Sequence, residues 1–109
     1  LDITALGTNA AATGAMLRAK ANRGATGENA VIWNAHRVDA IVGPVSIVIA
    51  NGMLGEVTPA MAAALSSSPA VKLLLPLNQD LVTMVGSRKE PLPHLVDELV
   101  ELLKEKAHV

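Results

Sequence analysis

Small polar residues follow three apolar segments of the chain, and their types suit anion binding through backbone N–H groups. Gly7, Thr8 and Asn9 follow the first segment, Gly43-Pro44 follows the second, and Asn78 follows the third. In open α/β sheets, ligands bind beyond the carboxyl ends of the strands, where helices begin with free N–H groups. We therefore predict that a small anionic ligand or a nucleotide binds where these turns meet.

Two further polar turns are candidates for the same site. Thr26 and Gly27 lie in "GATGENA", and Asn51 interrupts the apolar run "VSIVIANGML". Turn formation is the alternative explanation for these three residues, and helix capping is the alternative for Gly7-Thr8-Asn9. The complete predicted ligand-binding set is Gly7, Thr8, Asn9, Thr26, Gly27, Gly43, Asn51 and Asn78.

The sequence contains no catalytic or metal-binding pattern. The three histidines are far apart and lack the spacing of metal ligands, and cysteine is absent. Asp39, Glu56 and Asp80 are candidates for a carboxylate pair at the edge of the sheet, although their spacing alone does not establish one. We therefore predict no metal site, name no catalytic residue and leave any cofactor open.

Hydrophobic periodicity places these turns in an α/β chain. The expected strands are 1–6, 38–43, 71–76 and 81–86, and the expected helices start near Asn9, Thr26, Thr58 and Pro93. Residues 45–54 fit a buried strand or a buried helix, and we favour a helix. Only about five residues separate the strand 81–86 from the strand 71–76, which is too few for a parallel crossover, so we expect 81–86 to be antiparallel or at the edge of the sheet. This order predicts a three-layer α/β sandwich with a mostly parallel sheet and a C-terminal amphipathic helix.

Composition limits the partners. The 109 residues are half apolar, which fits a single domain over 1–109, and the net charge is −1. This near-neutral charge gives no electrostatic footprint for nucleic acid or an acidic membrane, so neither is expected as a partner. Trp33 is the only aromatic residue, so base stacking is not expected either. The apolar stretch 40–55 is shorter than the roughly 20 residues of a membrane span, and we expect a cytoplasmic protein. Residues 45–54 are more apolar than so small a core can hide, which favours a homo-oligomer.

Three segments, "ALGTNAAATGAMLRAKANRGATGENAVIWNA", "VDAIVGPVSIVIANGMLGEVTPAMAAAL" and "LLLPLNQD", resemble a family of small uncharacterised bacterial proteins that carry a domain of unknown function. This resemblance covers nearly the whole chain and implies a Rossmann-like fold. It also implies a strand, a glycine-rich loop and a helix before the position of Leu1. The chain starts directly on "LDITALG" without that unit, so we expect an incomplete N-terminus and carry no role of the loop onto these residues.

Three functions remain open from the sequence. The first is binding of a small anionic ligand or nucleotide at the carboxyl ends of the strands. The second is a non-catalytic, homo-oligomeric interaction module. The third is a nicotinamide-dependent enzyme that relies on the absent glycine-rich loop.

Overall fold

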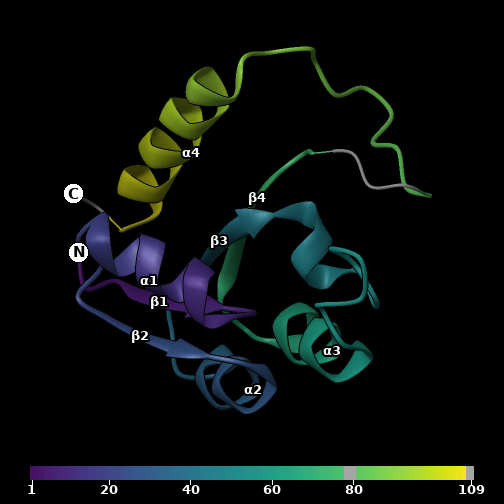
Figure 1. Cartoon of the computed structure of the whole chain (residues 1–109). Coiled ribbons are helices and arrows are strands. Elements are labelled where there is room, and N and C mark those ends of the chain that lie inside the picture. The colour runs from purple at the N-terminus through teal and green to yellow at the C-terminus, as the bar shows by residue number, and fades with distance from the viewer. Residues whose placement is uncertain (78–80, 108–109) are drawn as a thin grey trace.

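The computed structural model describes residues 1–77 and 81–107 and has the mixed α/β composition that the sequence predicts (Figure 1). The elements in chain order are β1 (Thr4–Gly7), α1 (Ala10–Arg18), β2 (Arg23–Thr26), α2 (Glu28–Ala35), β3 (Ala40–Pro44), the 3-10 turn η1 (Val45–Val48), α3 (Pro59–Ser67), β4 (Val71–Leu75) and α4 (Leu92–Ala107). Strands therefore alternate with helices through most of the chain, as expected for an α/β protein.

The strands form two separate parallel pairs, which corrects the expectation of one mostly parallel sheet. β1 pairs with β2, and β3 pairs with β4. The carbonyl of Ile3, just before β1, accepts a hydrogen bond from Arg23 N, and the carbonyl of Gly7 accepts one from Gly27 N, just after β2. Because a strand alternates its bonding edges, the main-chain groups of Thr4 and Leu6 point away from β2. No ladder joins β1 to β3 within the described residues, so both pairs have open edges, where a further strand can pair.

Helices cover both faces of the first strand pair. Leu6 packs against the main core, whereas its neighbour Gly7 faces Thr13 of α1. Alternate residues of a strand point to opposite faces, so α1 lies opposite the core that α2 and α3 share. That core is built from Val31, Ala35, Ile41, Val57, Met61, Ala62, Leu65 and Ala70. Leu6 and Ile41 thus join strands of the two pairs to one core.

Three local expectations need correction. Residues 23–26 form β2, which the sequence analysis missed, and only Val45–Val48 of the 45–54 segment are helical, as a 3-10 turn. Residues 81–86 form no strand but turns and extended backbone. Val82 makes only an isolated bridge, and Leu81 is 99% exposed and Val85 98% exposed, so no strand ladder of the described residues buries this apolar segment.

An ion pair ties the start of the chain to β2. The Arg23 guanidinium donates to both carboxylate oxygens of Asp2, at 3.0 and 2.5 Å. This hydrogen bonding holds the pKa of the Asp2 carboxyl below its ordinary value and raises the pKa of Arg23. Both side chains are exposed, so the pair is a surface contact of small energetic weight. Of the helices described, none is both long and apolar enough to cross a membrane.

Candidate functional site

The carboxyl ends of β1 and β2 lie side by side, and three helices begin beside them. Gly7 is the register partner of Thr26, and the Gly27 N–H donates to the Gly7 carbonyl at 3.0 Å. We call this edge the rim. It comprises Gly7, Thr8, Asn9, Thr26, Gly27, Glu28, Glu56 and Thr58, which lie at or next to the starts of α1, α2 and α3.

Asn9 caps α1, as the capping interpretation of the turn predicts. Its Oδ1 accepts a hydrogen bond from Ala12 N at 2.8 Å, and its carbonyl accepts one from Thr13 N at 3.2 Å. Gly7 is required by space, because a Cβ there would lie 2.2 Å from Thr13 Oγ1. The glycine therefore allows β1 to turn tightly into α1.

The side chains of Thr8 and Asn9 also donate hydrogen bonds to a carboxylate from a distant part of the chain, that of Glu56. Thr8 Oγ1 donates to Glu56 Oε2 at 3.0 Å, and Asn9 Nδ2 donates to Glu56 Oε1 at 3.2 Å. Glu56 follows β3 and η1, so the connection after β3 does reach the ends of β1 and β2. The sequence analysis considered Glu56 only for a carboxylate pair, and its contact with Asn9, 47 positions away, leaves no local signal.

A second carboxylate links α2 to α3. Thr58 Oγ1 donates to Glu28 Oε2 at 2.5 Å and accepts a hydrogen bond from Met61 N at 3.1 Å as the cap of α3. Glu28 lies in the first turn of α2, where a negative charge is stabilised by the helix dipole. The starts of α1 and α3 are thus capped by side-chain oxygens, whereas α2 has no side-chain cap and only the Glu28 charge in its first turn.

Thr26 and Gly27 have structural roles at the rim. Thr26 Oγ1 lies 2.8 Å from the hydroxyl of Thr13, a buried residue of α1. Gly27 precedes α2 with φ 97 and ψ 179, a conformation that is accessible essentially to glycine alone. The contact with α1 accounts for Thr26, and the backbone conformation accounts for Gly27.

Of the remaining predicted residues, Asn51 reaches the edge of the rim only through its backbone, beside Glu56 and Thr58, and Gly43 lies within β3. Asn51 is exposed at φ 64, and its backbone N–H donates to Val57 O at 2.8 Å within its own loop. Gly43 lies in β3 under Ile47, whose nearest carbon would be 3.2 Å from an added Cβ. In the described chain, neither makes a hydrogen bond with a rim side chain. Asn78 and Asp80 lie outside the described residues.

Two hollows lie away from the rim. One of about 420 Å³ lies between β4 and α4. The other, about 560 Å³, lies between α2 and the β1–β2 pair, beside Trp33, whose ring lies 4.0 Å from the Arg37 guanidinium carbon. Neither hollow is lined by a rim residue, and no cluster of possible metal ligands occurs among the described side chains.

The fold and the rim define a mixed α/β domain with helix starts gathered at the carboxyl ends of a parallel strand pair. The chain belongs to the family described as Domain of unknown function (DUF3842), whose model matches residues 1–108. No curated protein and no solved structure matches the chain.

Proposed function

We propose that this chain binds a small anionic ligand at the rim, in the position that the Glu56 carboxylate occupies. The observation that carries the proposal is the donor pair of Thr8 Oγ1 and Asn9 Nδ2, which already holds a carboxylate at 3.0 and 3.2 Å. A phosphate or carboxylate group of a ligand presents the same acceptors. The start of α1 adds free N–H groups and the positive end of the helix dipole.

We extend the proposal to a Rossmann-like arrangement with a nucleotide as one ligand class. Both strand pairs are parallel, and α1 lies on the opposite face of its pair from α2 and α3. In doubly wound folds, nucleotides bind beyond the carboxyl ends of the strands. The rim is at those ends, which supports this ligand class.

A ligand panel tests the proposal by thermal shift and calorimetry. We expect inorganic phosphate, a sugar phosphate or a nucleoside monophosphate to stabilise the chain, by about 2.7 kcal/mol at 100 times its Kd. Glu56→Gln should bind the anion about fivefold more tightly, because it removes one like charge worth about 1 kcal/mol at close range in water. Thr8→Val should weaken binding by removing one donor.

Glu105→Gln is the matched control, because it removes the same charge from an exposed position on α4. Its affinity for the anion should equal that of the wild type. If no ligand of the panel stabilises the wild type or Glu56→Gln, the proposal is wrong. Equal affinities of Glu56→Gln and Glu105→Gln would place the anion elsewhere.

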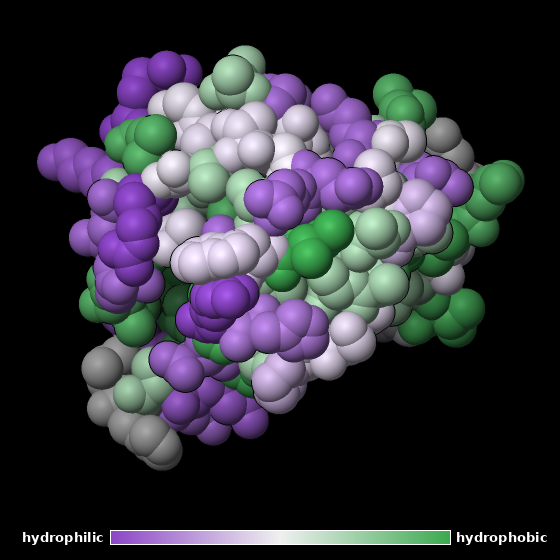
Figure 2. Space-filling model, turned by 90° about the horizontal axis from the view of Figure 1, so that it is seen from below, coloured by the Kyte–Doolittle hydropathy of each residue, from purple (hydrophilic) through white to green (hydrophobic). Residues whose placement is uncertain are grey.

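A homo-oligomeric interaction module is the second candidate, and the exposed apolar residues favour it. Leu54 is 94% exposed, and Leu81 and Val85 are almost completely exposed. In the view from below in Figure 2, hydrophobic side chains protrude at the periphery of the molecule, and the centre of this face mixes polar and apolar groups. Large apolar side chains left in water in this way favour burial against a partner chain.

Light scattering over a concentration series tests this second candidate. We expect the molar mass to rise above that of one chain with concentration, and to return to it in Leu81→Ser/Val85→Ser. Ser66→Ala, an exposed change on α3, is the control and should associate like the wild type. A monomer at every concentration would exclude the oligomeric module.

A further inference from the structure

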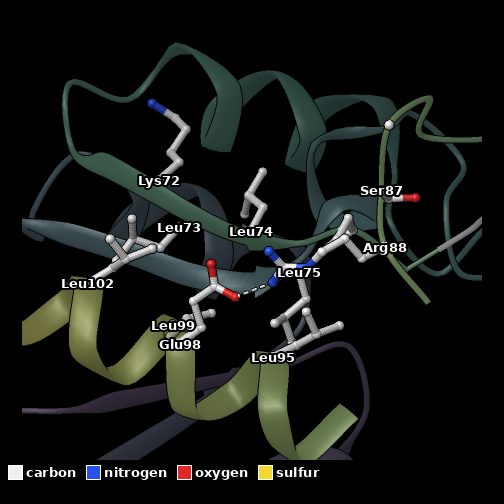
Figure 3. A pocket seen from close by; sticks show the side chains of 12 residues that line it. Lys72, Leu73, Leu74, Leu75, Ser87, Arg88, Leu95, Glu98, Leu99 and Leu102 are labelled. Atoms are coloured by element: carbon white, nitrogen blue, oxygen red, sulfur yellow. Dashed lines mark hydrogen bonds and ion pairs between the residues drawn. The ribbon is translucent and has the colours of Figure 1, made fainter. Parts of the chain in front are cut away.

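The hollow between β4 and α4 is lined by aliphatic side chains from both elements (Figure 3). Leu73 and Leu75 point from β4 towards α4, whereas Leu74 and Lys72 point to the opposite side of the strand. The facing residues of α4 are Leu95, Leu99 and Leu102. The volume of about 420 Å³ is within the range of small-molecule sites.

The helix that forms one wall is incompletely covered. α4 separates apolar from charged residues as a surface helix does, yet none of its described residues is buried. Leu102 remains 40% exposed although it lines the hollow. An apolar guest between β4 and α4 would therefore remove leucine surface from water on both sides.

One cation reaches into this leucine-lined space. Arg88 comes from the connection before α4, and its Nη2 lies 2.7 Å from Glu98 Oε2 between the strand and the helix (Figure 3). Its Nε also lies 3.7 Å from Glu90 Oε1. The Arg88 and Glu98 side chains are 63% and 53% exposed, so their pairing is weak and a carboxylate of a guest can replace Glu98.

We propose that the groove between β4 and α4 binds an aliphatic carboxylate, with its chain along the leucines and its carboxylate on Arg88. The lining contains aliphatic side chains, no aromatic ring and the charged residues Lys72, Arg88 and Glu98. Lys72 points away from α4, so Arg88 is the cation that faces the leucines, and the carboxylate of the guest would take the place of Glu98 on it. This site is separate from the rim and does not depend on the function proposed there.

Calorimetry with unbranched carboxylates from octanoate to tetradecanoate, below their micelle concentrations, tests the proposal on the whole chain. Each added methylene should tighten Kd about fourfold, which corresponds to about 0.8 kcal/mol of burial, until the chain fills the groove. The alcohol of equal length should bind about two- to fivefold more weakly, since it lacks the charge that the exposed Arg88 pairs with. Affinity that does not depend on chain length would overturn the proposal.

One arginine variant and one lysine variant separate the contribution of the carboxylate head group from that of the aliphatic tail of the ligand. Arg88→Gln should abolish the preference for carboxylate over alcohol and keep the dependence on chain length. Lys89→Gln removes the same charge from the adjacent residue, which does not line the groove, and should keep both properties. If both variants lose the preference for carboxylate over alcohol to the same extent, the effect is one of general charge and the proposal is wrong. A dimer that excludes the carboxylates would identify a second copy of the chain as the occupant and would also contradict the proposal.

Discussion

Gly7→Ala lowers the free energy of unfolding by about 1 to 3 kcal/mol, the usual cost of overpacking. The added Cβ would lie 2.2 Å from Thr13 Oγ1, 2.7 Å from Thr13 N and 2.9 Å from Asn9 O. Two of these three atoms belong to the backbone, so the start of α1 has to move away from β1. Urea denaturation, followed by the fluorescence of Trp33, measures the change in midpoint.

Gly14→Ala is the control for this effect, with the opposite sign. Gly14 lies inside α1, and an added Cβ there would meet only the flexible end of Arg18, at 3.4 Å. Alanine in a helix interior is favoured over glycine by about 0.5 to 1 kcal/mol. If both variants shift the midpoint in the same direction, close packing between β1 and α1 is not what requires glycine at position 7.

The Gly7 result also bears on the proposed ligand site. Thr8 and Asn9 follow Gly7 directly, and their side chains hold the Glu56 carboxylate. A shift of the helix start displaces these donors as well. We therefore expect weaker anion binding in Gly7→Ala, even at temperatures where the variant is still folded.

Met61→Ala lowers the free energy of unfolding by about 2 to 5 kcal/mol, the range for removing a large buried side chain. Met61 is 3% exposed on α3 and belongs to the core that also contains Val31 of α2 and Ile41 of β3. Leu6 of β1 packs against the same core. A cavity at Met61 therefore weakens both strand pairs together, and unfolding should remain a single transition by fluorescence and circular dichroism.

Met84→Ala is the matched control, because this methionine is 37% exposed in the connection between β4 and α4. It should change stability by less than about 0.5 kcal/mol, as surface substitutions usually do. Two separate transitions in Met61→Ala would show that the strand pairs fold independently, against the single domain that the sequence predicts.

Elements with a strong local signal were predicted from the sequence. Thr58 before Pro59 predicts the start of α3, and the structure confirms it through the Thr58 cap on Met61 N. The turn at Asn9 predicts the cap of α1 in the same way. The apolar runs at β3 and β4 and the amphipathic pattern of α4 are likewise confirmed. Each of these signals depends on residues a few positions apart.

Features that depend on distant contacts could not be predicted. β2 reads "RGAT" and lacks a strand pattern, because it is held by hydrogen bonds to β1 and is mostly exposed. By contrast, "LVTMVG" has a strand pattern but forms only an isolated bridge at Val82 and joins no strand ladder of the described residues, and Leu81 and Val85 stay in solvent. Strand formation requires a neighbouring edge, and composition does not specify which edges meet.

The sequence by itself determined the α/β class, the caps of α1 and α3 and the amphipathic C-terminal helix, since these follow from neighbouring side chains and backbone preferences. Only the tertiary structure decided that the strands form two pairs and that Glu56 occupies the donors of Thr8 and Asn9. The physical reason is that pairing and long-range hydrogen bonds depend on how the whole chain packs, and packing is not encoded in any one segment.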